Sequence, residues 1–165
     1  MTKPTTFAWH YTIVAYFKQI IRSGVLIPSG EHLPPSEKPI LWFSLNQYWE
    51  ATANKAWQNT TTGETRLLDM HETFEIGHGL IRFGVAPKKL LSGDALRRKA
   101  RMSKAVWDGL AQVGKEQGAN PTEWCGSIEA MPIDEMVIEA MDAAFEWKHL
   151  RQDQVDQLIS HFRTA

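Results

Sequence analysis

The sequence is poor in the features that mark secreted and membrane-spanning proteins. Its single cysteine, Cys125, cannot form an intrachain disulfide bond, which favours a reducing, cytoplasmic location. The longest apolar run lies near Ile40–Leu45, so no segment reaches the roughly 20 residues that a transmembrane helix requires. Met1–Thr6 has no apolar region, and we therefore do not expect a signal peptide.

Several common catalytic and metal-binding motifs are missing as well. The sequence has no Cys-x-x-Cys, no His-Glu-x-x-His, no Walker loop and no Gly-x-Ser-x-Gly. Gly77-His78-Gly79 lacks the third glycine of a dinucleotide fingerprint, so we interpret it as a turn. We accordingly predict that no metal site is present.

What the sequence does contain is typical of one globular domain. The 165 residues are 43% hydrophobic and 22% charged, with a net charge of −1. The charge is uneven, because the segment 88–104 carries seven bases and one acid and the rest of the chain balances it with −7. Such a basic segment attracts phosphate groups or acidic partners, although it is equally typical of a solvated helix face.

In roughly the first half of the chain, hydrophobic patterns predict three strands and one helix. Phe7–Thr12 and Leu80–Ala86 alternate as half-buried strands do, and Ile40–Leu45 is short and apolar enough for a buried strand. Ile13–Ser23 has helical spacing and ends at Gly24, a residue that favours a helix C-terminus.

The second half of the chain contains one ambiguous segment. We predict one long amphipathic helix from Gly93 to Asn120, which would make 88–104 a basic helix, and a last helix over Arg151–Arg163. Residues 132–145 fit a helix with Pro132 in its first turn. The alternative is strands over Ser127–Met131 and Met136–Ala140, with Phe145–Leu150 pairing back across a turn at Met141–Ala144. The pattern as a whole predicts a single α+β domain over residues 1–165, with small mixed or antiparallel sheets and helices packed around them.

His10 is the first candidate functional residue. On a strand, it shares a face with the small residues Ala8 and Thr12, while Phe7 and Trp9 lie on the opposite face and would occupy a core. Small neighbours would leave room for a ligand against the imidazole. The alternative is a histidine that is hydrogen-bonded for structural reasons.

These segments together resemble the ADP-ribosyltransferase superfamily. The likeness rests on His10-Tyr11-Thr12 in a first strand, on Leu41-Trp42-Phe43-Ser44 in a second, and on Ser127-Ile128-Glu129-Ala130-Met131-Pro132, which is similar to the Glu-x-Glu-x-x-x-Pro strand of arginine-specific members. Ser127 replaces the first glutamate of that motif, which puts arginine as an acceptor in doubt. The stretch from Leu41 to Glu50 also resembles uncharacterised bacterial and phage proteins.

The resemblance implies that NAD is the substrate and that Glu129, His10 and Ser44 are catalytic. Glu129 would stabilise the oxocarbenium-like cation that forms when the nicotinamide–ribose bond breaks. His10 would orient a ribose hydroxyl, and Ser44 would support the nicotinamide pocket or Glu129. The acceptor of ADP-ribose would be a protein or a nucleic acid.

Other residues would complete the NAD site. Tyr11 and Thr12 would bind the nucleotide beside His10, while Tyr48 or Trp49 would stack on nicotinamide. Arg82 or the basic helix would hold the diphosphate.

Two alternatives remain open. The first is a non-enzymatic interaction or inhibitor protein, in which Arg97, Arg98 and Arg101 of the basic helix bind nucleic acid or an acidic protein surface. The second is a chain that keeps the fold without the catalysis.

Overall fold

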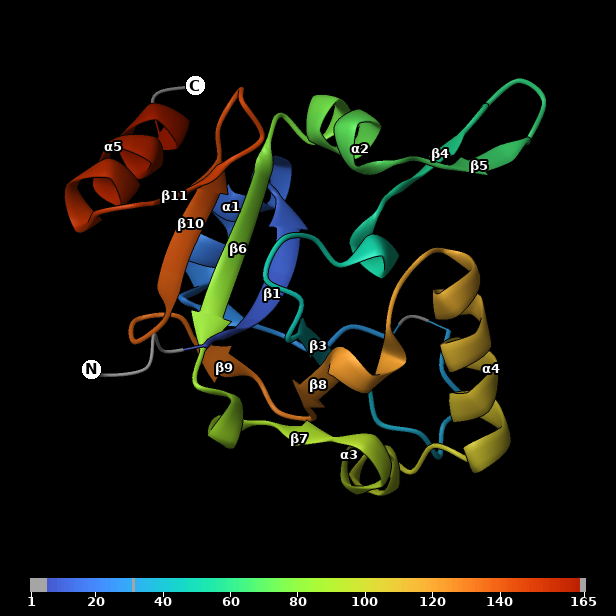
Figure 1. Ribbon diagram of the computed structural model, residues 1–165. Coiled ribbons are helices and arrows are strands. Elements are labelled where there is room, and N and C mark those ends of the chain that lie inside the picture. Colours follow the sequence, from blue (N-terminus) through green and yellow to red (C-terminus); the bar gives the residue numbers. More distant parts are fainter. Residues whose placement is uncertain (1–5, 31, 164–165) are drawn as a thin grey trace.

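Strand β1 (Ala8–Ile13) lies inside the main sheet of this computed structural model, which describes residues 6–30 and 32–163. It pairs over its whole length with β6 (Leu80–Val85) and on its other side with β3 (Leu41–Ser44). The sheet has seven strands in the order β11-β10-β6-β1-β3-β8-β7, and its neighbouring strands run antiparallel (Figure 1). Residues 1–5, to which the signal-peptide prediction mainly refers, lie outside the described residues.

The other elements are mostly short. The remaining strands of the main sheet are β7 (Leu91–Ser92), β8 (Trp124–Ser127), β10 (Val137–Met141) and β11 (Trp147–His149). Two separate two-stranded sheets consist of β2 (Val25–Leu26) with β9 (Met131–Pro132), and of β4 (Ala56–Gln58) with β5 (Thr65–Leu67). The helices are α1 (Val14–Ser23), α2 (Met70–Ile76), α3 (Gly93–Lys99), α4 (Lys104–Glu116) and α5 (Gln152–Arg163). Three 3-10 turns are η1 (Ala51–Ala53), η2 (Pro87–Lys89) and η3 (Pro121–Glu123).

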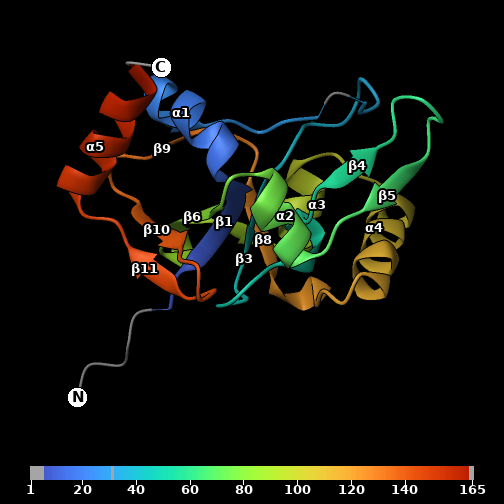
Figure 2. The ribbon, with the colours of Figure 1, turned by 90° about the horizontal axis from the view of Figure 1, so that it is seen from above.

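The largest core cluster covers the face of the sheet that carries Ala8. Ala8, Phe17 of α1 and Phe83 of β6 are fully buried there, and Val155 of α5 packs into the same cluster. Helices α1 and α5 lie side by side over this face (Figure 2). Thr12 is buried on this face as well, whereas His10 between Ala8 and Thr12 lines a cavity.

The opposite face of the sheet is also covered. Ile13, Leu80 and Met141 form a smaller buried cluster, against which Trp49 and Trp147 pack. Met70 and Phe74 of helix α2 pack against the same cluster. The strands β4 and β5 extend away from the sheet as an exposed hairpin (Figure 1).

Helix α1 ends as the sequence predicts. Gly24 adopts a left-handed conformation with φ 72°, and its N–H donates to the carbonyl of Ile20. Glycine takes this conformation without the steric penalty that a Cβ atom imposes. Strands β1, β3 and β6 and helix α5 likewise confirm the predicted segments to within a few residues.

The predicted long basic helix is wrong, because the chain breaks into α3 and α4. Arg101 has φ 57°, its N–H donates to Arg98 O, and the N–H of Met102 donates to Arg97 O. This arrangement is a Schellman motif, which ends α3 by satisfying its last carbonyls. Ser103 then caps α4, because its side chain accepts a hydrogen bond from the backbone N–H of Val106 in the first turn of that helix. The bases of 88–104 are therefore divided among η2, α3, the turn that follows α3 and the first residue of α4.

The ambiguous segment 132–145 is extended rather than helical. Strand β10 pairs with β6 on one side and with β11 on the other, and Met141 lies opposite Trp147. The strand alternative is thus confirmed for Met136–Ala140 and for the return through Phe145–Leu150. Long-range pairing with β6 decides the conformation, which local periodicity could not do. Ser127–Met131, by contrast, does not form one continuous strand.

The fold is a single α+β domain with one seven-stranded antiparallel sheet and two small two-stranded sheets. None of the described helices combines the length and the apolar composition needed to cross a lipid bilayer.

Candidate functional site

A cavity of about 510 Å³ lies where β1 and β3 separate. The two strands are in register at a single pair, Trp9 and Ser44, whereas β1 pairs with β6 over six residues. The walls come from β1, β3, η1 and α4, and the polar side chains among them include His10, Ser44, Glu50 and Lys55. The volume is within the range of small-molecule sites, and polar groups converge in an aromatic setting.

His10 bridges the two strands at this opening. Its Nδ1 lies 2.8 Å from the carbonyl oxygen of Trp42. Because a carbonyl only accepts hydrogen bonds, Nδ1 carries the proton and Nε2 is left with a lone pair in the neutral ring. Burial lowers the pKa of His10, and the positive charge of Lys55 lowers it further, while the bond to Trp42 opposes this shift. At neutral pH the imidazole is therefore uncharged and offers an acceptor.

Glu50 brings a carboxylate into the same cavity. Its side chain is buried, and Oε1 accepts hydrogen bonds from Thr52 Oγ1 at 2.8 Å and from Trp124 Nε1 at 3.2 Å. It also caps η1 by accepting the N–H of Thr52. These bonds hold one carboxylate oxygen in place, and the described residues give no hydrogen bond to Oε2.

Ser44 lies at the end of β3 where the strands part. It is 1% exposed, and its Oγ accepts a hydrogen bond from the N–H of Asn46 at 3.1 Å. Its hydroxyl proton is available to a ligand or a neighbouring acceptor.

Tryptophans form the wall of the cavity next to α4. Trp42 contacts Trp107 and Trp124, with ring centroids 6.0 and 5.8 Å apart. Gly114 permits α4 to approach Trp124, since a Cβ atom there would lie 2.5 Å from Cζ2 of the indole. Leu110 and Val113 of α4 continue this wall to the surface, where both are exposed. An aromatic wall with a few polar groups suits a heterocyclic ring.

No protein-family model, no curated protein and no solved structure matches the chain. Its function must therefore be inferred from the chemistry of its own cavity. Within residues 6–30 and 32–163, no group of three or more His, Cys, Asp or Glu side chains is arranged to hold a metal ion.

Two other hollows on the protein have fewer buried polar side chains that could bind or activate a ligand. One of about 290 Å³ lies between Trp57 and α2, and one of about 540 Å³ lies beyond the end of β6. Their ion pairs, Arg66–Glu72 and Lys89–Glu135, are exposed to solvent. Neither hollow has a histidine among its described lining residues.

Arg82, a predicted diphosphate ligand, is enclosed on the other side of β1. Its guanidinium carbon lies 3.8 Å from the ring centroid of Trp9 and 4.5 Å from that of Trp147. Arg82 forms an ion pair with Glu139 at 3.1 Å and donates to the carbonyl of Gln47 at 2.6 Å. Its charge is already compensated within the fold, and it is not among the residues that line the cavity.

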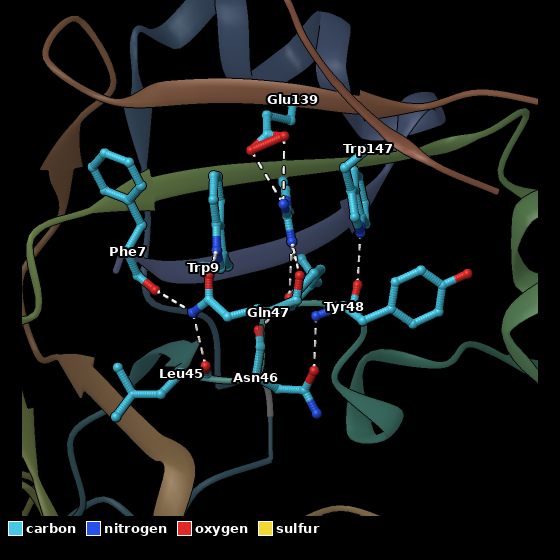
Figure 3. Close-up of polar contacts among 10 residues, drawn as sticks. Phe7, Trp9, Leu45, Asn46, Gln47, Tyr48, Glu139 and Trp147 are labelled. Carbon is cyan, nitrogen blue, oxygen red and sulfur yellow. Dashed lines mark hydrogen bonds and ion pairs between the residues drawn. The ribbon is translucent and has the colours of Figure 1, made fainter. Parts of the chain in front are cut away.

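The same cluster fixes the segment that carries Glu50. The ring N–H of Trp9 donates to Gln47 Oε1, and that of Trp147 donates to the carbonyl of Tyr48 (Figure 3). The amide nitrogen of Gln47 donates in turn to the carbonyls of Phe7 and Leu45. Residues 45–48 are thus fastened to β1 and β11, which determines where the chain enters η1.

The other predicted NAD-binding residues are only partly brought together. Tyr11 lines the cavity, and burial raises the pKa of its phenol to about 12. Thr12, Tyr48 and Trp49 are not among the lining residues. Tyr48 is 50% exposed and donates to the carbonyl of Phe145, while Trp49 donates to Asn54 Oδ1.

Glu129, the predicted catalytic carboxylate, lies outside the cavity. It is exposed, and its backbone N–H donates to Ser127 Oγ at 3.0 Å in the bend between β8 and β9. Ser127 pairs with Leu41, at the end of β3 away from Ser44. The structure therefore brings together His10, Tyr11 and Ser44 but leaves Glu129 apart.

The predicted partner-binding arginines lie at the end of α3. Arg97 is engaged, because it bonds to Asp94 and to the carbonyl of Met102. Arg98 and Arg101 are exposed, and neither has an ion pair among the described residues.

Sequence reasoning missed Glu50 and Lys55. Glu50 is the one acidic residue between Glu37 and Glu64, in a stretch rich in apolar and aromatic residues. A lone carboxylate in such a setting is a signal of a buried, hydrogen-bonded acid. No local pattern in the sequence predicted that Glu50 and Lys55 would line the same cavity as His10.

Proposed function

We propose that the protein binds NAD in the cavity between β1 and β3 and transfers ADP-ribose from it to a protein or a nucleic acid. Hydrolysis of NAD is a close variant of the same reaction. The observation that carries the proposal is the presence of a neutral histidine, a serine hydroxyl and a buried carboxylate in one aromatic-walled cavity. In this proposal Glu50 replaces Glu129 as the catalytic carboxylate.

The residue types suit each part of the reaction. His10 Nε2 accepts a hydrogen bond from a ribose hydroxyl, and Ser44 donates to the nicotinamide amide. When the bond between nicotinamide and ribose C1′ breaks, its electron pair leaves with nicotinamide and C1′ becomes part of an oxocarbenium-like cation. The carboxylate of Glu50 stabilises that cation. An acceptor oxygen or nitrogen then bonds to C1′ and loses its proton to Glu50 or to water.

The proposal is tested by comparing two glutamate variants. We expect Glu50→Gln to lower the rate of nicotinamide release from NAD by about 10²- to 10³-fold, as loss of one preorganised electrostatic group does elsewhere. The amide oxygen of glutamine still accepts the bonds from Thr52 and Trp124, so the fold is retained. Glu129→Gln is the matched control and should keep the wild-type rate. The assay includes candidate protein and nucleic-acid acceptors as well as NAD alone.

Calorimetric titration with NAD examines binding separately. His10→Ala should weaken NAD binding, and Glu50→Gln should leave it nearly unchanged because the carboxylate acts mainly in the transition state. An absence of heat at millimolar NAD, together with no nicotinamide release, contradicts the proposal. Loss of activity in Glu129→Gln alone would restore Glu129 as the catalytic carboxylate.

A second function is supported by the cations at the end of α3. Arg98, Lys99 and Arg101 are exposed and have no ion pair among the described residues. Such a cluster fits a nucleic-acid backbone, and binding would then weaken steeply as the salt concentration rises. Charge reversal of Arg98 and Arg101 should abolish that binding, whereas Glu50→Gln should not affect it.

A further inference from the structure

One basic side chain, that of Lys55, lines the cavity. Among the described lining residues Lys55 is the only lysine or arginine, and Glu50 is the only acid. Lys55 follows Asn54, the residue that ends η1, and its backbone N–H donates to Thr73 Oγ1 at 3.2 Å. The segment that delivers the carboxylate therefore also delivers a cation.

Among the described residues, the ammonium group of Lys55 makes a cation–π contact with Tyr16 and no ion pair with a carboxylate. Its Nζ lies 5.2 Å from the ring centroid of Tyr16, and no ion pair links it to an acid within the described part of the chain. The side chain is partly buried, which lowers the pKa of the amine, and its charge also lowers the pKa of His10. A partly desolvated cation without a counter-charge favours an anionic group of a ligand.

The other candidates for binding a phosphate lie elsewhere. Arg82 is held between two indole rings and paired with Glu139. Arg97, Arg98 and Arg101 are not among the residues that line the cavity. Lys55 is thus the cation that a ligand in this cavity would meet.

We infer that Lys55 binds the diphosphate of the nucleotide that occupies the cavity. This inference rests on the proposed function and makes it more specific, because it assigns the ligand a phosphate group on the Lys55 side and a ribose on the His10 side. A nucleoside without phosphate would lack the contact. Lys55 would therefore make the site selective for nucleotides over nucleosides.

The test compares ADP with adenosine by calorimetric titration. Wild-type protein should bind ADP more tightly than adenosine, and Lys55→Met should weaken ADP binding by about 10- to 100-fold, as expected for loss of a hydrogen bond to a charged group. Adenosine binding should not change. Lys55→Arg should keep most of the preference for ADP. Lys88→Met, which removes an exposed lysine outside the cavity, is the control for net charge.

The ratio of the two affinities separates a lost phosphate contact from a damaged fold. Damage to the fold would weaken ADP and adenosine alike, and thermal unfolding of Lys55→Met would detect it independently. The inference is overturned if wild-type protein fails to bind ADP, if it binds adenosine equally well, or if Lys55→Met retains the preference for ADP.

Nicotinamide release distinguishes failure of the inference from failure of the proposed function. Binding of ADP that depends on Lys55 without any consumption of NAD would uphold the inference and contradict the transferase. If the protein consumes NAD and Lys55→Met still prefers ADP to adenosine, the proposed transferase is upheld and the inference about Lys55 is contradicted.

Discussion

Gly114 of α4 lies against the indole ring of Trp124 so closely that a Cβ atom would be 2.5 Å from its Cζ2 and 2.6 Å from its Cη2. This contact lets α4 close one side of the cavity. It also places Trp124 where its Nε1 donates to Glu50. A missing side chain on a helix thus positions the carboxylate of the candidate site.

Replacing Gly114 should consequently destabilise the protein. We expect Gly114→Ala to lower the free energy of unfolding by about 1–3 kcal/mol, because the helix or the indole must move. Gly109 is the matched control in the same helix, since nothing lies within 4 Å of a Cβ atom there. Gly109→Ala should raise the free energy of unfolding by about 0.5–1 kcal/mol through helix propensity. Urea denaturation of both variants measures the difference, and equal effects would contradict the contact.

Arg82 should contribute strongly to the stability of the protein, because it forms a largely buried ion pair with Glu139. Arg82→Met leaves Glu139 without its partner, and the side chain of Glu139 is only 16% exposed. We expect a loss of about 3 kcal/mol in the free energy of unfolding, typical of breaking a buried ion pair. Arg98→Met, at an exposed position, should change stability by less than about 0.5 kcal/mol. Adding Glu139→Gln to Arg82→Met should recover part of the loss, and no recovery would argue against the pair.

His10 should make stability depend on pH below neutrality. The pKa of His10 is lowered in the folded protein, whereas an unfolded histidine has a pKa near 6.5. As the pH falls below about 6.5, the unfolded chain takes up the proton first, so stability decreases, by at most about 1.4 kcal/mol per pH unit. Above this range both states are neutral and His10 contributes nothing to the pH dependence.

Urea denaturation at pH 7.5 and pH 5.5 checks this sign. The wild-type protein should lose more stability between the two pH values than His10→Gln does, because glutamine does not titrate. Comparison with the variant cancels the contributions of the other histidines. Parallel pH profiles would show that the folded imidazole titrates normally.

Cys125 should react slowly with thiol reagents until the protein unfolds. It is buried between Phe43 and Ser92 in the sheet register, and burial raises the pKa of the thiol to about 11. Since the thiolate is the reactive form, labelling at pH 8 should be more than about 100-fold slower than that of an exposed thiol. A chromogenic disulfide reagent, used with and without denaturant, measures the two rates. Rapid labelling of the folded protein would contradict the burial of Cys125.

The sequence alone determined the elements whose residues form a regular local pattern. Alternation placed β1 and β6, a short apolar run placed β3, and Gly24 placed the end of α1, because each depends on residues a few positions apart. The α+β class follows from these elements. His10 and Ser44 were named as site residues from the resemblance to ADP-ribosyltransferases, whose motifs lie on two of those strands.

Only the tertiary structure decided the rest. The chain breaks at Arg101, which adopts a left-handed conformation although it is not a glycine. Strand β10 depends on pairing with β6, which lies more than fifty residues earlier in the chain. Glu50 reaches the cavity because distant tryptophans fasten the preceding segment and Trp124 binds its carboxylate. Such contacts join residues that are distant in sequence, so no local pattern encodes them, and the candidate site exists only where the fold brings them together.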